Sequence, residues 1–241
     1  MRVSIIIPAF NEERLLGASL AHIQAAAAAL TGRGWEVELI VCDNNSTDQT
    51  AAIAAAAGAR VVFEPVNQIG RARNCGAAAA TGDWLVFVDA DSQPSAELFA
   101  DMAGHISRGR CLAGGSTLRM DEYFLVASLL TTLWNFSSRV GRMLAGSFIF
   151  CEASAFRELG GFSNNLFVAE ELELSARLRQ VAAQKGRTIV ILHRHPMVTS
   201  ARKLRLYTAR EHFAYLFRAV FRQRSTLTSR QASYLWYDGR R

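Results

Sequence analysis

Several common signatures are missing from this 241-residue sequence. Its four cysteines are scattered and form no C-x-x-C pair, so neither a zinc site nor a disulfide framework is predicted, and free thiols in a reducing cytoplasm are expected. The longest nearly charge-free apolar stretch, 123–136, has 14 residues, fewer than the roughly 20 that a membrane-spanning helix needs. Only three isoleucines precede Pro8, too few for the apolar core of a signal peptide. A cytoplasmic protein is therefore expected.

Basic residues are scarce over the first three quarters of the chain. Residues 1–176 hold 12 Lys and Arg against 19 Asp and Glu, whereas 177–241 hold 15 against 2. The sequence therefore predicts a basic appendage on an acidic body. Such an asymmetry indicates an acidic partner, which could be an anionic lipid surface, a phosphorylated substrate or nucleic acid.

Two nucleotide-binding fingerprints are also absent. Pro8-Ala9-Phe10-Asn11 stands where a G-x-G-x-x-G would follow the first strand, and no G-x-x-x-x-G-K-[ST] occurs. These absences argue against a dinucleotide-dependent dehydrogenase and exclude P-loop chemistry.

The first half instead alternates strand and helix patterns. Apolar runs predict strands over 3–7, 35–42, 60–64 and 84–89, separated by helical stretches, the first of which Asn11 could cap. Four such repeats predict a parallel sheet flanked by helices. The second half is less regular: we expect strands over 111–117, 146–151 and 188–192, and helices over 121–140, over 152–159 and from 169 onward.

Two carboxylates follow the fourth strand, in Asp89-Ala90-Asp91. The carboxyl ends of strands in such sheets form the crevice where ligands bind. Oxygen ligands of this kind suit Mg²⁺ or Mn²⁺, which commonly bridge to phosphates, and the Gln93 amide could join them. The alternative is that Asp89 opens a turn and Asp91 caps the next helix.

Five motifs, taken in order, resemble the large family 2 of inverting glycosyltransferases with the GT-A fold. They are the 5–13 segment IIIPAFNEE, the 43–48 segment DNNSTD, the 70–76 segment GRARNCG, the Asp89-Ala90-Asp91 triplet, and the pair Gly160-Gly161-Phe162 with Glu170-Glu171-x-Glu173. The resemblance covers roughly residues 1–200. It implies a Rossmann-like, mostly parallel sheet flanked by helices and a nucleoside diphosphate sugar as donor, and no nucleic acid is expected as a partner.

The resemblance implies a nucleotide pocket at the ends of the first two strands. Asp43 matches the position that accepts hydrogen bonds from the base, so uracil or guanine would suit it, although an Asx turn would also explain an Asp there. Pro8, Ala9 and Glu12 match the pocket wall. Arg73 and Asn74 could contact the diphosphate or simply brace a loop, and Arg202 could close over the diphosphate or belong to the surface.

The resemblance also implies a metal site. Asp89, Ala90 and Asp91 match the D-x-D motif, whose acids hold the ribose and the metal that bridges the diphosphate. Some lipid-directed family members carry a Gln at the position of Gln93 as a further metal contact. A late histidine completes the metal sphere in some GT-A enzymes, so His193 or His195 could do so here, or could simply bond a carbonyl. Mn²⁺ or Mg²⁺ is the expected cofactor.

Glu171 matches the catalytic base of the family. An inverting transfer needs one carboxylate opposite the leaving group to take the proton of the acceptor hydroxyl. The family usually has Asp here, so the base could also be Glu170. No Q-x-x-R-W motif of processive synthases occurs, which favours single transfers.

The expected domain organisation is a glycosyltransferase domain over 1–203, with a nucleotide-sugar half (1–110) and an acceptor half (111–203), and a basic amphipathic tail over 204–241. Aromatic residues at helical spacing over 207–221 could lay that tail on an anionic membrane at its inner face, or could dock on the body. The acceptor could be a glycan, a lipid-linked molecule or a small molecule. Two other functions stay open: a non-catalytic sugar-nucleotide sensor or scaffold, and a sugar-nucleotide nucleotidyltransferase.

Overall fold

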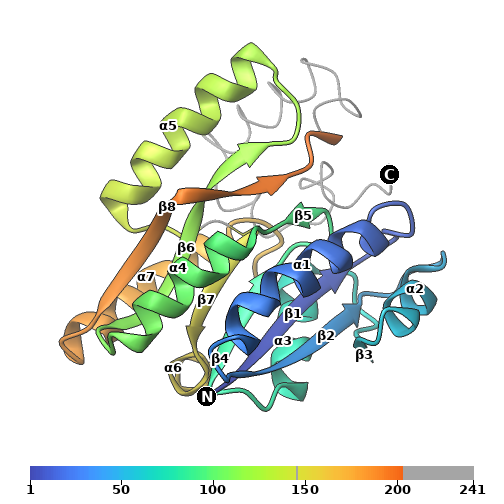
Figure 1. Ribbon diagram of the computed structural model, residues 1–241, viewed down its shortest axis with the longest axis horizontal. Helices are drawn as coiled ribbons and strands as arrows, with labels where there is room; N and C mark the ends of the chain where they lie inside the picture. Colours follow the sequence, from blue (N-terminus) through green and yellow to red (C-terminus); the bar gives the residue numbers. More distant parts are fainter. Residues whose placement is uncertain (145, 203–241) are drawn as a thin grey trace.

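The computed structural model describes residues 1–144 and 146–202, so the predicted tail helix lies outside the described residues. These residues form one eight-stranded sheet in the order β3-β2-β1-β4-β7-β6-β8-β5 (Figure 1). The strands are β1 (Arg2–Ala9), β2 (Glu36–Asp43), β3 (Arg60–Phe63), β4 (Trp84–Val88), β5 (Ser92–Gln93), β6 (Cys111–Met120), β7 (Phe148–Glu152) and β8 (Thr188–Thr199). The helices are α1 (Leu16–Thr31), α2 (Thr50–Ala56), α3 (Ile69–Ala79), α4 (Ala96–Ser107), α5 (Leu125–Gly141), α6 (Ala153–Glu158) and α7 (Glu170–Gln184).

The predicted parallel half is present. β1 pairs in parallel with β2 and β4, and β2 with β3. The other half is mixed, because β7 runs antiparallel to both β4 and β6 while β6 and β8 are parallel. The expected halves 1–110 and 111–203 therefore share one sheet, and the boundary between them stays a prediction.

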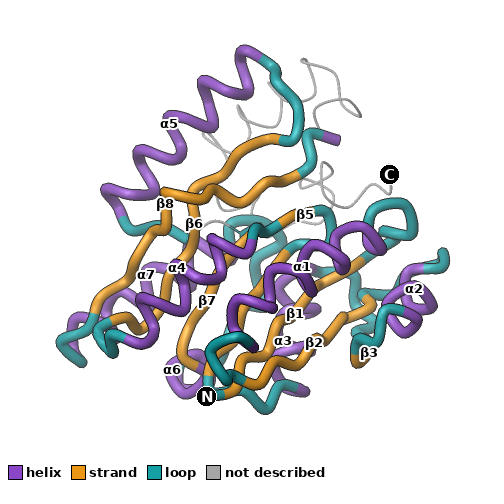
Figure 2. Tube along the Cα trace, viewed as in Figure 1, coloured by secondary structure: helices purple, strands orange, loops and turns teal. Residues whose placement is uncertain are grey.

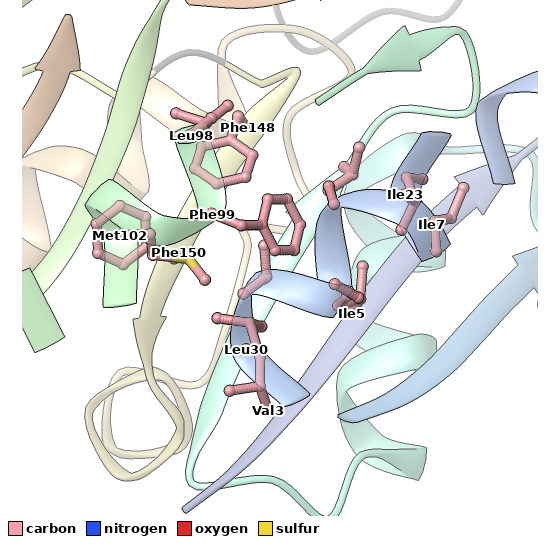
Figure 3. Close-up of a cluster of buried hydrophobic side chains, with 14 of the residues drawn as sticks. Val3, Ile5, Ile7, Ile23, Leu30, Leu98, Phe99, Met102, Phe148 and Phe150 are labelled. Atoms are coloured by element: carbon pink, nitrogen blue, oxygen red, sulfur yellow. The ribbon is translucent and has the colours of Figure 1, made fainter. Parts of the chain in front are cut away.

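Helices cover both faces of the sheet. Successive side chains of β1 and β4 point to opposite faces, and those on both faces are buried. One cluster joins Val3, Ile5 and Ile7 of β1 to apolar side chains of α1, α4 and β7 (Figure 3). The second cluster joins Ile6 and Phe87 to α3, α6 and α7. Each fully buried side chain of this size contributes about 1.5–3 kcal/mol, so the doubly covered centre fixes the strands whose ends carry the candidate site.

Two sequence expectations need correction. Asn11 does not cap the first helix, which begins at Leu16; it takes a left-handed backbone conformation (φ 52°) in the loop after β1. The strand expected to end at residue 192 continues to Thr199, because β6 offers partners on both sides of an irregularity. Ser116 pairs with Leu192 and Leu118 with Met197, so residues 193–196, which include Pro196, bulge out of the ladder.

No helix among the described residues is long and apolar enough to cross a membrane. α5 packs on β6 and β8 and stands clear of α1 and α4, as the tube view shows (Figure 2).

Candidate functional site

The carboxyl ends of β1 and β2 bring the predicted nucleotide-pocket residues together. Asp43 ends β2 and is the register partner of Ala9, the last residue of β1. Its side chain is largely buried, and its Oδ1 accepts the backbone N–H of Ser46, three residues on, at 3.0 Å, so it braces the loop without forming an Asx turn. This bond is compatible with a base-reading role, because a carboxylate has further acceptor capacity.

Hydrogen bonds that the sequence motifs did not predict connect the loop after β1 to the loop after β2. Asn11 accepts the backbone N–H of Thr47 at 2.8 Å and donates its own N–H to the Ser46 hydroxyl at 3.0 Å. The backbone N–H of Glu12 donates to Thr50 Oγ1 at 2.8 Å. These bonds hold Glu12 and Asp43 at a fixed spacing.

Arg202 links the first loop to the loop after β4. Its guanidinium donates to both carboxylate oxygens of Glu12, at 2.7 and 2.8 Å, and its Nη2 lies 3.8 Å from Asp91 Oδ2. The chain thus brings together residues that lie 190 positions apart. Burial alone would lower the pKa of Arg202, but the hydrogen bonds and charge of Glu12 raise it, so the side chain remains a cation.

Arg73 is the centre of the other half of the site. This fully buried side chain donates to Glu170 Oε1 at 2.6 Å, to Asp89 Oδ1 at 2.9 Å and to the Gly146 carbonyl at 3.2 Å. Its guanidinium carbon also lies 5.2 Å from the centre of the Phe162 ring. Burial would lower the pKa of Arg73, but Asp89 and Glu170 raise it above its usual value.

Glu170 and Glu171 have different surroundings although they are adjacent. Glu170 is buried against Arg73, whereas Glu171 is partly exposed; both line a pocket of about 150 Å³ together with Arg73 and Asp89. Burial, together with the negative charge of Glu171, raises the pKa of Glu170 to about 8, although Arg73 opposes the shift. The pocket therefore holds three acidic groups around one arginine, of which Glu170 keeps its proton up to about pH 8.

The direction of both glutamates is set by the turn before α7. Ala169, the residue before the helix, has a left-handed backbone (φ 64°), which is uncommon for a residue other than glycine. Glu173, the third acid of this turn, points elsewhere and pairs with Arg177 at 2.5 Å.

Asn74 braces a loop. Its amide donates to the Phe162 carbonyl at 2.9 Å, and its Oδ1 accepts the Phe162 backbone N–H at the same distance. The neighbouring Gly161 has φ +75°, and a Cβ there would lie only 2.5 Å from Asn74 Oδ1. The Gly-Gly-Phe motif is therefore explained by this close contact, with Phe162 packed beneath Arg73.

His193 does not line the pocket that Asp89 lines, whereas Gln93 lies two residues after Asp91 and its role at the metal stays a prediction. Gln93 pairs with Val198 on β8 and lines a pocket of about 540 Å³ beside α5. His193 stands at the start of the bulge in β8 and lines a separate pocket with Arg33 and Arg108. His195 also faces that side, where its Nδ1 lies 3.1 Å from Asp101.

The donor set at the aspartates fits a hard divalent cation only when a ligand supplies further oxygens. Among the described residues, no group of three or more His, Cys, Asp or Glu is arranged to hold a metal ion by itself. Asp89 and Asp91 offer two carboxylates, which is the number that Mg²⁺-type sites commonly use when substrate phosphates and water complete the shell. The protein residues therefore fit a cation that binds together with a phosphate-bearing substrate.

The raised pKa of Glu170 predicts a pH dependence of stability. Unfolded chains release this proton near the ordinary pKa of 4.5, whereas the folded chain keeps it until about pH 8. Between these values the folded state binds more protons, so the free energy of unfolding should fall as pH rises. Urea denaturation in EDTA at pH 5, 6.5 and 8 should show this fall, and Glu170→Gln should reduce its slope. Equal slopes in the two proteins would contradict the assignment.

The chain was compared with known proteins. The model of the family described as "Glycosyl transferase family 2" matches residues 4–156. An uncharacterized glycosyltransferase of Mycobacterium tuberculosis is 38% identical over 113 residues, which are 47% of this chain and 47% of that protein. The chain thus spans about half the length of the curated relatives it first matches.

Two solved structures have a similar fold. Glucosyl-3-phosphoglycerate synthase from M. tuberculosis, crystallised with Mn²⁺, UDP and phosphoglyceric acid, gives a TM-score of 0.62 at 22% identity and covers 90% of this chain and 75% of its own. The mannosyltransferase PcManGT from Pyrobaculum calidifontis, in complex with GDP-Man and Mn²⁺, gives a TM-score of 0.67 at 19% identity and covers 94% and 62%. The predicted fold class is confirmed for the described residues.

Proposed function

Because the chain belongs to glycosyl transferase family 2, we propose that it moves a single sugar, with inversion, from a nucleoside diphosphate sugar to an acceptor hydroxyl in a reaction that needs a divalent cation. One observation carries the proposal. Charged side chains gather at one edge of the sheet: Asp43 at the end of β2, the linked Glu12, Arg202 and Asp91, and the Arg73 cluster with Asp89. The acids suit a base and a cation, and Arg202 suits a diphosphate.

The nucleotide occupies the end of the site at β1 and β2. Asp43 accepts hydrogen bonds from the N–H groups of uracil or guanine, and Pro8, Ala9 and Glu12 form the pocket wall. Pro8 and Ala9 are buried in β1, so this wall is rigid.

Asp89 and Asp91 hold the cation, Mn²⁺ or Mg²⁺, with the backbone at Ala90 between them. When bound, it offsets the negative charge that develops on the departing nucleoside diphosphate. Arg202 lies within 3.8 Å of Asp91 and moves from Glu12 to the diphosphate oxygens as the donor binds.

Glu171 is the catalytic base. It is partly exposed in the pocket that Asp89 also lines, so an acceptor hydroxyl can reach it. Glu170 instead fixes Arg73, which in turn positions Asp89.

Asp91→Asn tests the cation site. We expect turnover, measured as acceptor-dependent release of nucleoside diphosphate with Mn²⁺ present, to fall at least about a hundredfold, because this change removes one anionic ligand. Asp83→Asn is the matched control, since Asp83 immediately precedes β4, at the end of the strand opposite to Asp91. Retained turnover in Asp91→Asn would overturn the metal assignment.

A donor screen tests the function itself. Calorimetry with UDP- and GDP-sugars and Mn²⁺ should identify one tight donor, and nucleotide release should follow with the right alcohol. Binding without release under any acceptor would favour a sensor, and pyrophosphate production from a nucleoside triphosphate and a sugar phosphate would favour a nucleotidyltransferase. A cytoplasmic location and a membrane contact through residues 204–241 are part of the proposal.

A further inference from the structure

The polarity of α5 is reversed relative to an ordinary surface helix. Six large apolar side chains on it are between 56% and 72% exposed: Leu125, Leu129, Leu130, Leu133, Phe136 and Val140. Five of them recur at intervals of three or four residues and, at about 100° per residue, lie within an arc of about 80°. An apolar stripe of this kind normally faces a protein core, but here it faces outward.

The inner side of α5 is polar. Asn135 clamps β6, because its Oδ1 accepts the Leu118 N–H and its Nδ2 donates to the Leu118 carbonyl, both at 2.9 Å. Ser138 is buried and donates to the Met143 carbonyl at 2.6 Å. Ser128 and Thr131 line the pocket of about 540 Å³ that Gln93 also lines. These bonds fix the rotation of α5 about its axis, so the apolar stripe is held facing outward.

Positive charge lies at the carboxyl end of the stripe. Arg139 and Arg142 are exposed there, and Arg179 donates to the Gly141 carbonyl at 2.8 Å. At the amino end, the backbone N–H of Ala201 donates to Asp121 at 2.8 Å, so the last described residues lie beside the start of α5.

We propose that the outer face of α5 rests on an anionic membrane surface. A helix of 17 residues, about 25 Å long, with an apolar stripe and a basic carboxyl end has the character of a helix that lies in the plane of a membrane. Anionic headgroups complement the exposed arginines. A two-fold dimer through α5 would offer these arginines no acidic side chain, because α5 carries none. The placement rests on the proposed function in one respect: the α5 pocket, beside the Asp91 loop, then opens toward a lipid-borne acceptor.

Vesicle flotation of the full chain tests the surface. The wild type should float with vesicles of phosphatidylglycerol and phosphatidylethanolamine and much less with phosphatidylcholine alone. Leu129→Gln with Leu133→Gln should weaken partitioning at least tenfold without changing net charge. Phe63→Gln with Val66→Gln is the matched control, because these residues are 57% and 45% exposed on and after β3, and it should float as the wild type does.

Several results would overturn the proposal. The wild type could fail to float, or the α5 variant could float as well as the wild type. A dimer that the α5 variant dissociates, without flotation, would make a second copy the occupant. Faster proteolysis of residues 203–241 in the α5 variant, without flotation, would make that segment the occupant. Calorimetry with UDP, GDP and Mn²⁺ without vesicles separates the membrane contacts from the enzymatic function. Nucleotide binding without flotation would overturn the contacts of α5 and of residues 204–241 and leave the sugar transfer standing, whereas flotation without nucleotide binding would overturn the sugar transfer alone.

Discussion

Glu171→Gln should lower turnover about a hundredfold to ten-thousandfold while leaving donor affinity nearly unchanged. The substitution keeps the shape of the side chain but replaces the carboxylate by an amide, which is too weakly basic to take the acceptor proton. On the proposed function, donor affinity depends on Asp43 and the aspartates after β4 and not on Glu171. Nucleoside diphosphate release and calorimetry of donor binding, measured on the same preparation, check both parts.

The neighbours of Glu171 supply the controls. Glu173→Gln removes a carboxylate two residues along the same helix, where Arg177 binds it, and should leave turnover within a few-fold of the wild type. Glu170→Gln should lower turnover less than Glu171→Gln does, through Arg73. If Glu170→Gln abolishes turnover and Glu171→Gln does not, the base is Glu170.

Arg73→Met should cost about 3–5 kcal/mol of unfolding free energy at pH 8.5. The substitution leaves Glu170 and Asp89 without their shared cation inside a buried site, and the contact with the Phe162 ring changes as well. The loss should be smaller at pH 6, where a protonated Glu170 needs no counter-charge. Urea denaturation at the two pH values measures the difference.

Lys185→Met is the control for this prediction. Lys185 pairs with Glu158 at 2.7 Å, but both side chains are substantially exposed, so removing the lysine should cost no more than about 1 kcal/mol at either pH. Arg73→Met with Glu170→Gln should recover part of the lost stability, because no unpaired carboxylate then remains at position 170. A loss for Arg73→Met that matches the control would show that the buried cluster contributes little.

The local sequence was sufficient to predict the strands whose ends carry the acidic residues. The buried run of β4 and the two aspartates after it share one edge with β1 and β2, as the alternation of strands and helices predicts. The role of Arg73 was not predictable in the same way. Its partner Glu170 is 97 residues away, and nothing in a single sequence shows that an arginine on a helix is fully buried.

The surroundings of His193, Gln93 and α5 could not be predicted from the spacing of apolar residues. The bulge opposite β6 and the pairing of β5 with β8 decide which pockets His193 and Gln93 line, and neither feature shows in the spacing of residues. The stretch 121–140 is mostly apolar and was expected to be helical, yet the same spacing fits a helix buried in a core and one whose apolar stripe faces outward. Only the contacts of Asn135 with Leu118 decide between them.

The left-handed turn at Ala169 also sets the helical phase of α7. Each residue of a helix turns by about 100°, so Glu170 and Glu171 are separated by little more than a quarter turn, one toward Arg73 and the other toward the open pocket. A residue inserted within 163–168 would disturb the Asn164 and Leu166 carbonyls, which accept the Gln68 amide. One inserted between Glu171 and Leu174 would turn both carboxylates by about 100° relative to the buried face of α7. We therefore expect little tolerance of a change in length on either side of the two glutamates.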